Sequence, residues 1–179
     1  MSGTRKAMWL GAIGATGLLG TAATLEAQRA SPMDYARAEI AGHPIEVQYG
    51  RPAMREREVF GGLVPLDQVW RTGANEATHL RTPVDLVIGE VRIAAGEYTL
   101  YSIPSEDGWT LIINRQTGQW GTAYDESQDL VRLPMQVETL VDPVERFTIT
   151  LGVGEESDGL LVLEWELTRG SLAFNVSAE

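Results

Sequence analysis

The sequence predicts an all-β fold: an antiparallel β-sandwich or flattened barrel of about ten strands, with an N-terminal signal segment. Two observations predict the sheet. Apolar and polar residues alternate in short runs after residue 37, and Gly, Pro, Asn or Asp separates these runs about every 8–12 residues. A third observation argues against a helical domain, because no window of about twelve residues there holds a clean apolar stripe at helical spacing.

Each expected strand is a run of alternating residues that a turn residue ends. The runs cover residues 45–49, 78–82, 84–88, 91–93, 98–103, 109–113, 130–137, 147–151, 160–167 and 172–176. Pro52 and Pro104 follow two of them, because proline cannot continue a sheet ladder. The last two runs are predicted to form a terminal hairpin that turns near Arg169-Gly170. Residues 52–57 and 126–130 are the best candidates for short helices.

The N-terminus has the pattern of a secretory signal. Arg5 and Lys6 precede an uncharged, largely apolar stretch from residue 7 to residue 23, and small residues follow it. We therefore expect residues 1–27 to be a cleaved signal peptide, 28–37 a polar leader and 38–179 a single β-sandwich domain. The protein would then be exported, periplasmic or secreted, with no stable membrane span after cleavage.

The composition excludes several kinds of chemistry. The chain has 179 residues, no cysteine and two histidines, so thiolate catalysis, iron–sulfur clusters and a three-histidine metal site cannot be built within it. Its only lysine, Lys6, lies in the signal, so a lysine nucleophile or base is also excluded. The net charge of −11 argues against nucleic-acid binding, because phosphate backbones repel an acidic surface.

Several longer stretches carry a family resemblance. They are Arg51-Pro52 followed by residues 59–65 (VFGGLVP), residues 69–78 (VWRTGANEAT), and residues 95–104 (AGEYTLYSIP) continuing to 109–114 (WTLIIN). Through them the chain resembles the family called domain of unknown function 2911, over about residues 31 to 177. The resemblance implies a bacterial, exported single domain and no particular reaction. Residues 54–57 (MRER) depart from the Lys-Gly-Arg-like turn of the relatives.

The densest group of polar side chains lies in the segment Trp70 to Arg81. Gly73 suits a tight turn, and hydrogen-bonding groups crowd close to Trp70, as a pocket for a polar ligand requires. The predicted ligand-binding residues are Arg71, Asn75, Glu76, Thr78, His79 and Trp120, the last as an exposed ring on which a sugar could stack. The bland alternative is that Arg71 pairs with Glu76, Asn75 caps a turn and Trp70 belongs to the core.

Other constellations give weaker signals. Glu76 and His79 are three residues apart, which places them on opposite faces of a strand, and no third metal ligand lies nearby in sequence. We therefore predict no metal site and no cofactor. Four arginines, Arg51, Arg55, Arg57 and Arg71, could clamp a carboxylate or phosphate, but Glu56 and Glu58 lie among them and local ion pairs are the favoured interpretation.

The function that these observations favour is a non-catalytic module at the cell envelope. Its partner would be a small polar ligand, a glycan or an envelope protein. The alternative is a small-substrate hydrolase that uses Glu76 with His79 or Arg71, and the second alternative is a purely structural or assembly module. These three hypotheses differ in whether the segment Trp70–Arg81 forms a concave site that solvent can reach.

Overall fold

The protein is all-β, as predicted. The computed structural model describes residues 31–177, so the predicted signal peptide lies outside the described residues. The strands are β1 (Met33–Ile40), β2 (His43–Gly50), β3 (Thr78–Thr82), β4 (Asp85–Ile88), β5 (Val91–Ile93), β6 (Gly96–Ser105), β7 (Gly108–Asn114), β8 (Asp129–Val153) and β9 (Asp158–Ser177). A single 3-10 turn, η1 (Glu126–Gln128), precedes β8, and none of the described residues forms an α-helix that could cross a membrane.

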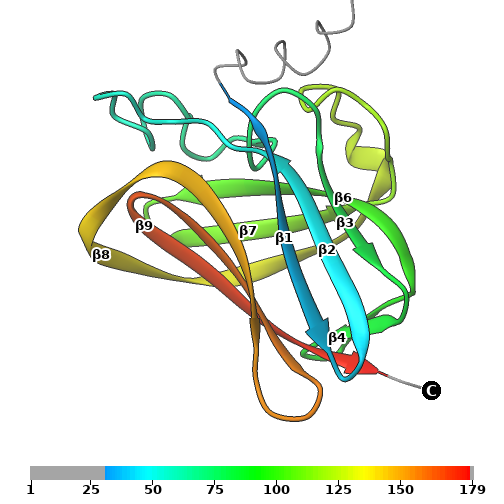
Figure 1. The fold of residues 1–179 in the computed structure, drawn as a ribbon. Coiled ribbons are helices and arrows are strands. Elements are labelled where there is room, and N and C mark those ends of the chain that lie inside the picture. Colours follow the sequence, from blue (N-terminus) through cyan, green and yellow to red (C-terminus); the bar gives the residue numbers. More distant parts are fainter. Residues whose placement is uncertain (1–30, 178–179) are drawn as a thin grey trace, which may run out of the picture.

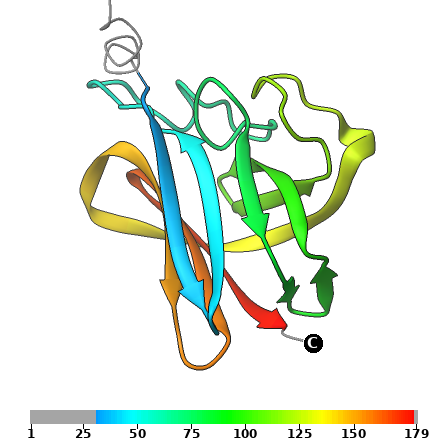
Figure 2. The ribbon, with the colours of Figure 1, turned by 45° about the vertical axis from the view of Figure 1, so that its right-hand side comes forward.

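The nine strands form one antiparallel sheet in the order β1-β2-β3-β6-β7-β8-β9-β4-β5. The sheet folds over on itself, so that β1 and β2 lie across β8 and β9 (Figures 1 and 2). Its edge strands, β1 and β5, do not pair with each other, and the sheet is therefore not closed into a barrel. The arrangement is sandwich-like because two layers of strands enclose a common core.

The core follows from the alternation in the strands. In β2, Ile45, Val47 and Tyr49 are buried while the residues between them face outward. An aromatic cluster lies under one end of the sheet; its members are Phe60, Trp70, Trp109, Phe147 and Trp165. The rings of Trp70 and Trp165 are stacked, with their centroids 5.9 Å apart and their planes at 22° to each other. This cluster supports the site described below.

Strand β1 begins within the segment that is predicted to be a polar leader. Residues 28–37 were expected as a polar leader, yet Met33–Ile40 forms β1 and pairs with β2 over its whole length. Only Ala36 and Ile40 of this strand are buried, so its sequence lacks an obvious alternation of apolar and polar residues. The two-residue turn Ala41-Gly42 has positive φ at both positions, which is the geometry of a tight hairpin.

The predicted terminal hairpin at Arg169-Gly170 is wrong. β9 runs without interruption from Asp158 to Ser177, and Gly170 is a strand residue. A Cβ at Gly170 would lie 3.1 Å from the ring of Trp109, so the glycine makes room for that indole rather than for a turn. Likewise, the runs at 130–137 and 147–151 belong to one bent strand, β8, whose register with β9 shifts between Thr139 and Thr148.

Candidate functional site

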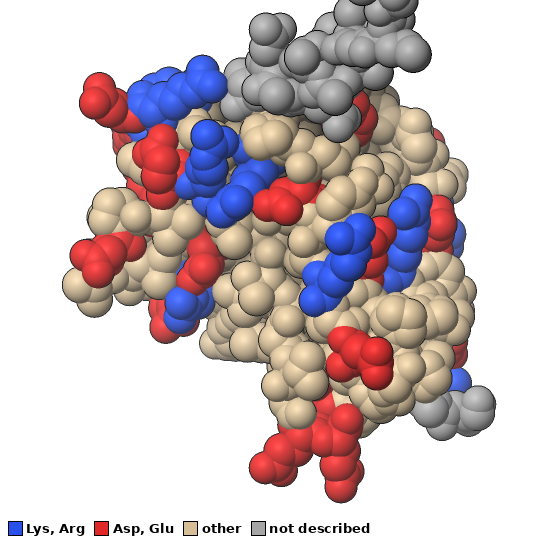
Figure 3. All heavy atoms as spheres, in the orientation of Figure 1, with Lys and Arg blue, Asp and Glu red and all other residues tan. Residues whose placement is uncertain are grey.

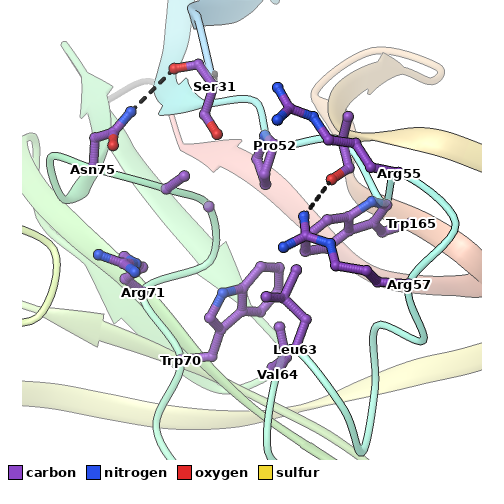
Figure 4. Close-up of a pocket in the computed structure, with 13 residues that line it drawn as sticks. Ser31, Pro52, Arg55, Arg57, Leu63, Val64, Trp70, Arg71, Asn75 and Trp165 are labelled. Atoms are coloured by element: carbon purple, nitrogen blue, oxygen red, sulfur yellow. Dashed lines mark hydrogen bonds between the residues drawn. The ribbon is translucent and has the colours of Figure 1, made fainter. Parts of the chain in front are cut away.

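A pocket of about 340 Å³ opens between two parts of the long loop that joins β2 to β3. Figure 4 shows Arg55 and Arg57 on one wall and Arg71 and Asn75 on the other. Trp70 lies at the bottom, with Trp165 of β9 behind it. Among the described residues that line the pocket there is no aspartate, glutamate or histidine. Figure 3 shows Lys and Arg atoms over these loops, at the upper left of the molecule.

The wall that carries Arg71 and Asn75 is a rigid loop. Trp70 exchanges backbone hydrogen bonds with Ser102 of β6 (2.7 and 2.9 Å), which fixes the start of the loop. The hydroxyl of Thr78 donates to the carbonyl of Thr72 (2.8 Å), which closes it. Thr72 and Asn75 both have positive φ, and strained backbone of this kind persists only where surrounding structure holds it.

Arg71 has an unusual environment for an arginine. Its aliphatic stem packs against Gly121, where an added Cβ would come within 2.6 Å of the Arg71 Cδ. Its guanidinium makes no hydrogen bond or ion pair with any part of the chain that the structure describes. The alternative in which Arg71 pairs with Glu76 is therefore wrong. All the donors of this guanidinium remain available to a ligand.

The opposite wall holds the Arg57 side chain by two backbone carbonyls. Arg57 donates from Nε to the carbonyl of Met54 (2.9 Å) and from Nη2 to the carbonyl of Ala53 (3.0 Å). These bonds aim the guanidinium without neutralising it, because both acceptors are uncharged. Arg55 and Glu56 both have positive φ, which turns the chain sharply at this wall.

The predicted local ion pairs with Glu56 and Glu58 are not seen among residues 31–177. Arg51 does pair, but with Asp34 of β1 (3.2 Å), and it also donates to Thr148 of β8. Arg51 therefore ties β1 to β8, whereas Arg57 and Arg71 lie beside the pocket without a carboxylate partner in the part of the chain that the structure describes.

The floor of the pocket is aromatic. Trp165 is buried and donates its Nε1 to the carbonyl of Glu145 (3.3 Å). Trp70 is also largely buried, but its Nε1 makes no hydrogen bond with a described residue, and Figure 4 shows this nitrogen on the side of Arg71. The floor thus offers an apolar surface together with one N–H donor.

Of the six predicted ligand-binding residues, only Arg71 and Asn75 line this pocket. Thr78 is fully buried, and its hydroxyl is used to close the loop. Trp120 is 52% exposed and pairs with Glu76 in an isolated β-bridge, away from the pocket lining.

Glu76 and His79, the candidate catalytic residues, both lie outside the lining of the pocket. His79 lies in β3 opposite Gln48 and Thr99, and its charged neighbours are Arg81 and Glu97. No group of three His, Asp or Glu side chains among residues 31–177 could hold a metal ion.

The environment of His79 predicts a pH effect on stability. Burial, reinforced by the charge of Arg81, lowers the pKa of His79 below its usual 6.5. As the pH falls below about 6.5, His79 therefore binds a proton in the unfolded chain before it does so in the folded chain. Protonation then favours the unfolded chain, and the contribution of His79 to stability is lost. In urea titrations, the free energy of unfolding of the wild type relative to His79→Gln should decrease between pH 8 and pH 5. A difference that stays constant with pH would contradict this assignment.

The fold and the pocket define the class: an antiparallel all-β domain with an arginine-lined pocket in the loops at one end of its sheet. The model for proteins of unknown function (DUF2911) matches residues 31–174, and the chain belongs to that family. Comparisons with curated proteins and with solved structures gave no match.

Proposed function

We propose that this domain is exported and binds a small anionic ligand in the pocket between Arg57 and Arg71, without catalysing a reaction on it. One observation carries the proposal: arginines line the pocket, and no described lining residue is acidic. In a chain of net charge −11, a cationic pocket of this kind is a local exception. Guanidinium groups bind carboxylates and phosphates by charge-assisted, often bidentate, hydrogen bonds.

The absence of an acid or base among the described lining residues supports a binding role. Arginine stays protonated at physiological pH, and tryptophan and asparagine do not titrate there, so these groups can hold an anion but cannot readily move a proton. Preformed walls also favour binding. The Arg57 side chain is anchored by two backbone carbonyls, and the Arg71 stem is confined by Gly121, so less side-chain entropy is lost when a ligand arrives.

Thermal unfolding with inorganic phosphate as the probe tests the proposal. Phosphate at ten times its Kd should stabilise the wild type by about 1.4 kcal/mol, which raises Tm by about 3–6 °C. Arg71→Gln removes a charged donor and should weaken binding about tenfold or more, so the same phosphate concentration should raise Tm by only about 1 °C. Chloride at matched ionic strength corrects for screening.

Arg37→Gln is the matched control. Arg37 is an exposed arginine of β1 that pairs with Glu46, and it is not part of the pocket. This variant should keep the full phosphate-induced shift. If Arg71→Gln responds to phosphate as the wild type does, the pocket is not the binding site. If phosphate, acetate and butyrate all leave the wild-type Tm unchanged, the proposed function is wrong.

A further inference from the structure

Cationic groups stand on two facing walls of the pocket. In Figure 4, the guanidinium of Arg71 lies on one side and that of Arg57 on the other, with Trp70 between them at the floor. Each is held from its own side, Arg57 by the carbonyls of Ala53 and Met54 and Arg71 by the packing of its stem. The two charges are therefore fixed in separate positions.

Neither charge is balanced by a carboxylate of the described residues. Arg71 makes no ion pair or hydrogen bond with the residues that the structure describes. Arg57 uses two of its N–H donors on uncharged carbonyls and has no carboxylate partner among those residues. Asn75 adds a carbonyl and an amide beside Arg71, and its amide is already tied to the carbonyl of Ser31 (3.0 Å). The polar groups of the pocket are thus concentrated on its two walls.

The region between the walls is apolar. The side chains of Leu63, Val64 and the Trp70 ring line it. A charged group placed there would lose hydration without gaining an ion pair. A small single anion that binds one arginine also leaves the other without a counter-charge.

We infer that the ligand carries two anionic groups joined by a short uncharged spacer, one bound by Arg71 and the other by Arg57, with the spacer on Trp70. This inference rests on the proposed function and adds the number and placement of the ligand's charges. The anionic groups are carboxylates or phosphates, which guanidinium groups recognise through the same geometry.

Isothermal titration with two matched series of probes tests the inference. Succinate, glutarate and adipate are compared with their monomethyl esters, and pyrophosphate is compared with orthophosphate. At least one diacid, or pyrophosphate, should bind about tenfold or more tightly than its partner, because the second charge-assisted pair adds to the first. The series that shows the larger advantage identifies the chemical source of the anion.

Single substitutions then locate the two charges. In Arg57→Gln the preferred dianion and its monoanionic partner should bind with nearly equal Kd, and the same loss of preference is expected for Arg71→Gln. Arg57→Lys keeps the charge but loses the planar guanidinium, and it should retain part of the preference. This variant shows whether the loss in Arg57→Gln comes from the missing charge or from a disturbed loop. Arg37→Gln should retain all of it.

The outcomes separate the inference from the proposed function. If every dianion binds no more tightly than its monoanionic partner, while Arg71→Gln still weakens both, the pocket binds a single anion and the inference is overturned. If no probe binds, both the inference and the proposed function are wrong. A dianion preference that survives Arg57→Gln in full would place the second anion elsewhere and also overturn the inference.

Discussion

Gly50→Ala is expected to lower the free energy of unfolding by about 3 kcal/mol or more and to abolish anion binding. A Cβ on Gly50 would lie 1.9 Å from the backbone oxygen of Ala74, a distance that no rotamer change can relieve. The end of β2 and the loop of the Arg71 wall are in direct backbone contact here, and the amide of Ala74 donates to the carbonyl of Gly50 (3.2 Å). The substitution must displace one of these segments.

Urea unfolding gives the change in free energy, and thermal unfolding with and without phosphate gives the change in Tm and in anion binding. The Tm should fall by about 6–12 °C, and the phosphate-induced shift should vanish, because Arg71 and Asn75 follow the displaced loop. Gly152→Ala is the matched control: Gly152 also lies in a strand, but its added Cβ meets Leu160 at ordinary distances, 3.4 Å from its Cβ and 3.7 Å from its carbonyl oxygen. We expect that variant to stay within about 1 kcal/mol of the wild type. Wild-type stability in Gly50→Ala would show that the loop is not seated on β2.

The strands that the sequence predicts well are those with one buried face. The alternation of Ile45, Val47 and Tyr49 with polar residues is visible in the sequence because every second side chain of β2 enters the core. β1 was missed for the opposite reason, since it buries only two residues and its polar side chains resemble a leader. Residues 138–146 of β8 were missed because most are exposed, as the 95% exposure of Val141 illustrates.

The candidate site could be predicted only in part. Arg71 and Asn75 lie in a dense polar segment beside Trp70, and this density is visible in the sequence. The role of Arg57 depends on where the side chains of Glu56 and Glu58 point. Their proximity in sequence predicted ion pairs with Arg57, which the described residues do not form. Trp165 reaches the pocket from β9, far along the chain, so no local pattern could have placed it there.

The resemblance to a family of unknown function was confirmed over residues 31–174, and it settles the family without selecting a ligand. The ligand class proposed above comes from tertiary structure, because one long loop brings Arg57 and Arg71 to two walls of the pocket. Composition alone gave the opposite expectation, since an acidic chain repels anions on average. A local cluster without carboxylates overrides that average at short range, where Coulomb attraction is strongest.

Trp165→Ala is expected to destabilise the protein by about 3–5 kcal/mol and to weaken anion binding as a secondary effect. Trp165 is 1% exposed, and its ring packs within 6.3 Å, centroid to centroid, of Phe60, Trp70 and Phe147. Truncation leaves a large cavity directly behind Trp70, and the cost combines lost burial with unfilled volume. The carbonyl of Glu145 also loses one of its two donors and keeps the amide of Met54 (2.8 Å).

Trp165→Phe and Trp120→Ala isolate the cause. Trp165→Phe refills most of the cavity and should recover at least half of the lost free energy of unfolding, together with anion affinity. Trp120 is half exposed and outside the pocket, so Trp120→Ala should change stability by about 1 kcal/mol or less and leave phosphate binding intact. If Trp120→Ala instead abolished binding while Trp165→Ala preserved it, the ligand would lie on the outer surface beside Glu76 rather than above the aromatic floor.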